Sequence, residues 1–255
     1  MLSQPTETLE LLDEIIGVLM ECTVMIEGVY CARSEDAVQE TIISCLKLKQ
    51  EAQLWYERLK STNEGPLYTL MPDEANIHHS SMTKLLFPER CEFASVDLAE
   101  AHMLYCTALL IISSLFYEVE RRKECNQRSP SDDPGLEHCA TYCDKGSGPL
   151  LKESKFYADQ ICRGAGYFIQ PHMHILGAHH LLFPLTMAAK FFYGNGFGDR
   201  YHWCQEVLTV LGNTGIGLAS ILQGTPWSKY NTEENQNVHI MARGSPTNVI
   251  VNLEV

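Results

Sequence analysis

The sequence predicts an all-α protein in which several helices pack around one core. Three observations support this prediction: 45 % of the 255 residues are hydrophobic, apolar residues recur at spacings of three and four in several segments, and two-residue alternation occurs only in residues 248–255. A chain of this length and composition can bury a substantial core. We therefore expect one helical domain over residues 1–222, followed by an irregular tail over residues 223–255.

The first two predicted helices lie in the amino-terminal quarter of the chain. Apolar residues in the segment 9–25 recur at helical spacing and form one stripe. A second amphipathic segment covers residues 35–62, and Ser34 precedes it as an N-cap with acidic residues in the first turn. The segment 66–90 contains prolines and no sustained period, so we predict a loop with at most short structure.

The third predicted helix, residues 95–123, is apolar on all sides in its middle, which indicates a central position in the core. Residues 124–149 are polar and rich in glycine and proline, so we expect a flexible insertion. Helical periodicity resumes in three further segments, which are 150–169, 181–193 and 201–211. The alternating glycines of the segment 194–198 follow a helix and not a strand, so they predict a turn between two helices instead of a phosphate-binding loop.

The charge of the chain disfavours direct binding to nucleic acid. Acidic residues outnumber basic ones by 32 to 19, which gives a formal net charge of −13 that repels a phosphate backbone. The longest apolar stretch, residues 103–117, is shorter than the roughly 20 residues that a membrane span needs, so we expect a core helix and no membrane partner. Residues 1–10 lack the pattern of a secretory signal, which favours an intracellular protein.

Cysteines and histidines are the candidate metal ligands of the sequence. None of the ten cysteines forms a C-x-x-C pair, and in an intracellular chain they are expected to be reduced. Four histidines cluster in a short segment, but no H-E-x-x-H motif and no neighbouring carboxylate accompanies them. We therefore predict no catalytic residue, no metal site and no cofactor, and retain the histidines as candidates for an alternative function. These candidates are His172, His174, His179 and His180.

One segment carries a family resemblance. An Ile-Cys-Arg helix, a Tyr-Phe-x-Gln-Pro turn, a glycine loop, a Phe-Pro-Leu step and a Trp-Cys pair follow one another between residues 159 and 204. This order resembles a recurring segment near the carboxyl terminus of fungal binuclear zinc-cluster transcription factors, which carry six cysteines in their DNA-binding cluster. Weaker similarity extends over residues 9–222. The motif residues are Cys162, Arg163, Tyr167, Phe168, Gln170, Pro171, Gly177, Phe183, Pro184, Trp203 and Cys204.

The chemistry of these motif residues suggests packing and not catalysis. We expect Pro171 to end the loop, Pro184 to open a helix and Gly177 to adopt an unusual backbone angle. The aromatic residues, among them Phe183, are expected to be buried.

The resemblance implies a helical regulatory domain of a nuclear transcription regulator, with genes of a specialised (secondary) metabolic pathway as targets. The six-cysteine cluster of the family is missing here, because residues 1–60 contain only Cys22, Cys31 and Cys45. The chain would therefore act through a protein partner, such as a DNA-binding transcription factor, unless the cluster was lost in evolution or is encoded by an omitted upstream exon. Three alternatives stay open: a small helical metabolic enzyme or ligand-binding protein with a histidine-lined site, a cytoplasmic location, and an adaptor that forms homo-oligomers.

Overall fold

The computed structural model describes residues 5–31, 34–72, 86–127 and 148–224. Within these residues the chain forms seven α-helices and one two-stranded hairpin, which confirms the predicted all-α class. The predicted insertion falls mainly on residues 128–147 and the predicted tail on residues 225–255, both outside the described residues.

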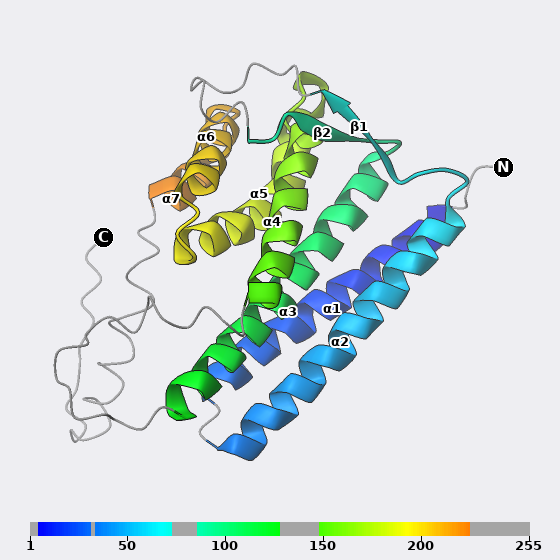
Figure 1. Cartoon of the computed structure of the whole chain (residues 1–255). Coiled ribbons are helices and arrows are strands. Elements are labelled where there is room, and N and C mark those ends of the chain that lie inside the picture. The colour runs from blue at the N-terminus through cyan, green and yellow to red at the C-terminus, as the bar shows by residue number, and fades with distance from the viewer. Residues whose placement is uncertain (1–4, 32–33, 73–85, 128–147, 225–255) are drawn as a thin grey trace, which may run out of the picture.

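Helices α1 (Pro5–Cys31) and α2 (Glu35–Thr62) lie side by side as an antiparallel hairpin (Figure 1). Ser34 caps α2 as predicted, because its hydroxyl accepts a hydrogen bond from the backbone N–H of Ala37 at 3.2 Å. The indole of Trp55, which is buried, donates a 2.8 Å hydrogen bond to the carbonyl of Leu11 across the two helices. This bond satisfies the one polar group of a large core side chain.

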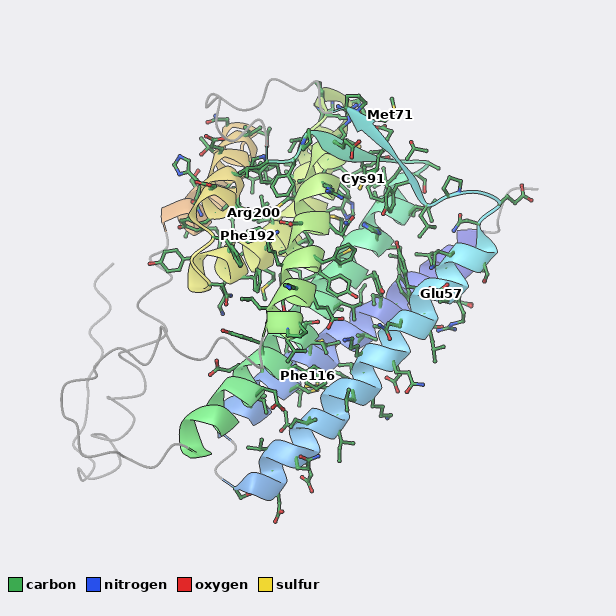
Figure 2. The ribbon with its side chains drawn as sticks, viewed as in Figure 1. Glu57, Met71, Cys91, Phe116, Phe192 and Arg200 are labelled. Carbon is green, nitrogen blue, oxygen red and sulfur yellow. The ribbon has the colours of Figure 1, made fainter. Side chains whose placement is uncertain are left out.

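Strands β1 (Tyr68–Pro72) and β2 (Glu89–Phe93) form an antiparallel pair in which Tyr68 lies opposite Phe93. The pair occupies the two ends of the predicted loop, and β2 packs on α4 (Gly148–Phe168). Figure 2 shows Cys91 of β2 beside this helix, and the side chain of Cys91 is fully buried. This segment has no sustained hydrophobic alternation, yet it forms strands because the buried Cys91 and Phe93 and the aromatic Tyr68 pack well on a sheet.

Helix α3 (Val96–Gln127) is central, because it contacts α1, α2, α4 and α5 (His174–Gly194). Ser95 caps it, accepting a 3.3 Å hydrogen bond from the N–H of Leu98. Two segments, Val96–Glu120 and Pro171–Gly194, are long and apolar enough to cross a membrane by length and composition alone. In α3 the most apolar window is 78 % buried inside the protein, so its composition suits a core helix.

Helix α5 begins earlier than predicted, at His174 and not at residue 181, and Pro184 lies inside it instead of opening it. The cause is tertiary: Gly177 and Ala178 are buried, so packing stabilises the first two turns although the sequence has no cap there. A short 3₁₀ turn, η2 (Pro171–Met173), separates α5 from α4.

The chain then turns through residues 194–198 into α6 (Gly198–Asn213), as the glycine pattern predicts. Gly196 has a φ of 75°, which a glycine adopts without strain, and the N–H of Phe197 donates a 2.9 Å bond to the carbonyl of Phe192. A last helix, α7 (Gly217–Gly224), was not predicted and packs on α6.

Candidate functional site

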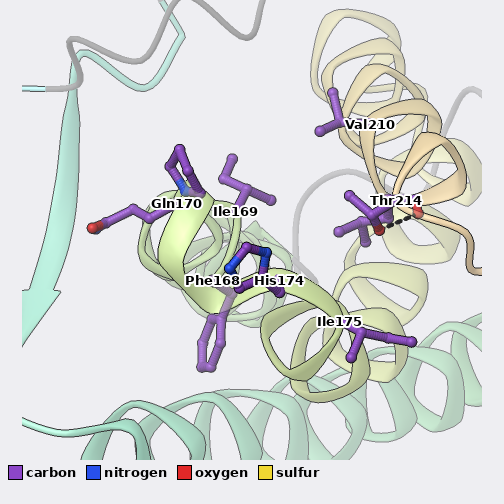
Figure 3. Close-up of a pocket in the computed structure, with 9 residues that line it drawn as sticks. Phe168, Ile169, Gln170, His174, Ile175, Val210 and Thr214 are labelled. Atoms are coloured by element: carbon purple, nitrogen blue, oxygen red, sulfur yellow. Dashed lines mark hydrogen bonds between the residues drawn. The ribbon is translucent and has the colours of Figure 1, made fainter.

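A half-open cavity of about 400 Å³ lies between the turn that joins α4 to α5 and the carboxyl-terminal half of α6 (Figure 3). Six apolar side chains and three polar ones line it. The apolar residues are Phe168, Ile169, Pro171, Ile175, Val210 and Leu211. The polar residues are Gln170, His174 and Thr214. A concave apolar surface with a few polar groups is the usual form of a small-molecule site.

The α4–α5 turn owes its shape to the Gln170-Pro171 step. Gln170 is extended, with φ −62° and ψ 144°, as expected of a residue before proline. Pro171 then occupies the first position of η2, where a missing N–H costs nothing. The side-chain amide of Gln170 donates a 3.0 Å hydrogen bond to Oε2 of Glu92, which ties the turn to β2.

Gly177 allows α5 to cross the end of α4 in close contact. A Cβ at this position would lie 2.0 Å from the carbonyl oxygen of Phe168 and 2.8 Å from Cβ of Met173. The predicted role for Gly177 was wrong in its mechanism: among the described glycines only Gly196 and Gly215 have a positive φ. Glycine is needed here for space and not for an unusual backbone angle.

His174 has a φ of 45° and a ψ of −137° and is the one described non-glycine residue with a positive φ. Holding a histidine in such a region costs on the order of 1–3 kcal/mol, and strain of this kind concentrates at binding sites. The imidazole is exposed and lines the cavity, as Figure 3 shows. Its ring nitrogens can donate to or accept from a bound molecule.

The other three histidines do not join His174. His172 and His179 are exposed, and Nδ1 of His180 lies 3.1 Å from Oε1 of Glu100 on α3. Among the described residues, no group of three or more histidine, cysteine or acidic side chains is placed to hold a metal ion. None of the described residues that line the cavity carries a carboxylate, so none of them offers His174 an acid–base partner.

Three of the four aromatic residues of the motif are buried as predicted, since Tyr167, Phe168 and Trp203 are at most 6 % exposed. The motif cysteines Cys162 and Cys204 are buried as well, at most 1 % exposed. The exception is Phe183, which is 47 % exposed, so the prediction that it is buried was wrong. It lies two positions after the buried Leu181, a step that rotates it by about 200° to the opposite face of the helix.

Arg163 and Pro184 complete the motif. Pro184 is buried within α5. Arg163 is partly buried near the hairpin, where its positive charge opposes the rise that burial causes in the pKa of Cys91. Its Nε has no hydrogen-bond partner among the described residues. Pro184 therefore contributes to the packing of α5, and Arg163 lies where α4 meets the hairpin.

A second group of polar side chains, which the sequence analysis missed, lies in the core around His102. Its Nδ1 is 2.7 Å from the hydroxyl of Tyr56, and its Nε2 is 3.5 Å from Sγ of Cys106. The Tyr56 ring stacks on Tyr105 with centroids 3.9 Å apart. The only sequence signal was the four-residue spacing of His102 and Cys106 in an apolar helix.

The chemistry of this buried group is that of a neutral core network. Burial lowers the pKa of His102 to about 4 and raises the pKa values of Tyr56 and Cys106 above their usual range. The imidazole is therefore uncharged and the thiol protonated at neutral pH, which removes the thiolate that nucleophilic catalysis needs. The cavity is the better candidate for a functional site.

Comparisons of the chain with protein-family models, with curated proteins and with solved structures found no match.

Proposed function

We propose that this chain is a helical regulatory domain of transcription that binds a small apolar effector and acts through a protein partner. The observation that carries the proposal is the cavity at the α4–α5 turn. Phe168, Gln170 and Pro171 line it, and these are the residues of the Tyr-Phe-x-Gln-Pro turn that resembles zinc-cluster transcription factors. The motif and the concave surface therefore coincide.

The position of the cavity favours a regulatory effect of binding. One wall belongs to the α4–α5 turn and the other to α6, which are separated by about 40 residues in sequence. A molecule that contacts both walls binds best when they keep one relative position, and so it shifts the population toward that arrangement. The strained His174 backbone lies in the α4–α5 wall, so a molecule bound there contacts a segment that is already held in a sparsely populated backbone conformation.

Two properties support action through a partner. The net charge of −13 opposes direct contact with DNA. In addition, α1 carries exposed apolar residues at four-residue spacing, Ile16, Met20 and Val24, which lie on one face of the helix. Exposed apolar stripes of this kind often mark protein contacts.

Genome-wide chromatin occupancy of a tagged copy in the source organism tests the regulatory part. We expect promoter peaks for the wild type and their loss in Met20→Glu, which charges the exposed stripe without touching the core. A copy that stays in the cytoplasm without promoter peaks would refute the proposal. That outcome would favour the alternative of a ligand-binding protein, which the position of His174 in the cavity supports.

The effector part is tested with a matched pair of variants on α5. Ile175 lines the cavity, whereas the neighbouring Leu176 does not, and both are exposed. We expect Ile175→Trp to fill the cavity, to lower binding of the apolar dye anilinonaphthalene sulfonate and to change promoter occupancy. Leu176→Trp should leave both unchanged. Equal behaviour of the two variants would exclude the cavity as the effector site.

A further inference from the structure

We propose that Cys162 and Cys204 form an oxidative modification site, a thiol pair that a hydroperoxide converts into a disulfide between α4 and α6. Their sulfur atoms lie 3.8 Å apart, in van der Waals contact, although 42 residues separate them in sequence. The function proposed above uses neither thiol, so this inference stands independently of it.

An ion pair links the two helices next to the cysteines. One turn before the two cysteines, Nε of Arg200 donates to Oδ1 of Asp159 at 2.8 Å, and Figure 2 marks Arg200 on α6 near α4. The second carboxylate oxygen, Oδ2, accepts from Lys155 at 2.6 Å. This ion pair links α4 and α6 one turn from the cysteines, and a disulfide requires the sulfur atoms to close from 3.8 Å to roughly 2.05 Å.

The chemistry balances with one hydroperoxide per pair. The first thiolate attacks a peroxide oxygen, the O–O bond breaks, and a sulfenic acid forms with release of water or an alcohol. The second thiol then attacks the sulfenic sulfur, the S–O bond breaks, and water leaves as the S–S bond forms. In total the two thiols lose two protons and two electrons, and the peroxide is reduced.

Burial sets the rate of this reaction. Both side chains are at most 1 % exposed, and burial together with the neighbouring thiol raises the pKa of Cys162 well above its usual range. The thiols therefore react only when α6 opens locally from α4, which makes the pair insensitive to brief exposure and responsive to sustained oxidant. Once formed, the disulfide joins the helices that carry the two walls of the cavity.

The test uses the full reduced chain incubated with hydrogen peroxide under native conditions, followed by alkylation of free thiols in denaturant and peptide mass spectrometry. We expect a linked pair of peptides containing Cys162 and Cys204, with a mass lower by two hydrogens, which disappears on treatment with a dithiol. Cys106 is the internal control. It is equally buried, but among the described residues its sulfur contacts the imidazole of His102 and not a second thiol.

A second measurement reads the effect on the fold. The disulfide closes a loop of about 40 residues, which should raise the unfolding temperature by about 5–10 °C. Cys204→Ala should lose this increase while keeping a helical spectrum. The proposal is overturned if, after peroxide treatment of the folded wild type, Cys162 and Cys204 are found alkylated, over-oxidised or paired with other cysteines.

Discussion

Replacing Gly177 with alanine tests the close crossing of α4 and α5 that shapes the cavity. The added methyl group would lie 2.0 Å from the carbonyl oxygen of Phe168 and 2.8 Å from Cβ of Met173. Both distances are far shorter than a van der Waals contact of roughly 3.5–4 Å. One of the opposing atoms belongs to the backbone, so no side-chain rotation can relieve the clash, and the two helices must move apart.

The size of the effect follows from two opposing terms. Alanine favours a helix over glycine by about 1 kcal/mol, whereas overpacking a well-packed contact costs about 1–3 kcal/mol and more when the backbone must shift. With the overpacking cost at the upper end of this range, we expect a net loss of about 2 kcal/mol in the free energy of unfolding. For a domain of this size that loss lowers the unfolding temperature by roughly 4–8 °C.

The assay is urea unfolding followed by circular dichroism at 222 nm, with Gly17→Ala as the matched control. Gly17 lies in α1 and a Cβ there would meet nothing within 4 Å, so the same substitution should stabilise the protein by about 0.5–1 kcal/mol. Opposite signs for the two variants support the reasoning. A Gly177→Ala protein as stable as Gly17→Ala would refute the close crossing.

Three further predictions concern single side chains. Trp203→Ala should lower the free energy of unfolding by about 3–5 kcal/mol because the indole is buried, whereas Phe183→Ala should cost less than about 1 kcal/mol because that ring is half exposed; urea unfolding measures both. His102 is neutral in the fold, with a pKa of about 4 against 6.5 in the unfolded chain. Its contribution to the free energy of unfolding is therefore complete above pH 6.5. This contribution falls by about 3 kcal/mol as the pH drops to 4, because the unfolded chain binds the proton first. Unfolding curves at several pH values should show a smaller fall for His102→Gln. His174→Gly should raise the free energy of unfolding by about 1 kcal/mol, because glycine adopts a positive φ without strain.

Each of these has a contradicting result. Equal losses for Trp203→Ala and Phe183→Ala would mean that the face of α5 is assigned wrongly. Identical pH profiles for the wild type and His102→Gln would mean that the imidazole is not buried uncharged. A loss of stability in His174→Gly would show that the imidazole contributes more than its backbone strain costs.

The sequence predicted those elements whose signals are local. The Ser34 cap and the periods of residues 9–25 and 35–62 depend on neighbours within one or two turns, and the structure has both helices there. The start of α5 was misplaced because it depends on Gly177 packing against Phe168, which is a tertiary contact. The burial of Phe183 was mispredicted for another reason: it was expected from the aromatic character of the residue, without regard to its position on the helix relative to the buried Leu181.

The cavity was beyond sequence reasoning for a related reason. Its α4–α5 wall consists of residues that the motif had singled out, but Val210 and Leu211 of the opposite wall look like ordinary core positions of an amphipathic helix. The histidine cluster in the sequence did not predict a shared site. The segment changes from a 3₁₀ turn to an α-helix at His174, so histidines that are close in sequence point in different directions. Only His174 reaches the cavity.

The hydrogen bond between Tyr56 and His102 has a consequence for how the chain chooses one fold. Helices packed through apolar side chains can slide by one turn, about 5.4 Å, and still bury similar area. In this alignment of α2 on α3 the Tyr56 hydroxyl lies 2.7 Å from Nδ1 of His102, and a shift by one turn would take this partner away from a buried imidazole. One bond of modest net strength thus disfavours misaligned pairs of α2 and α3, because losing it costs about 1–3 kcal/mol.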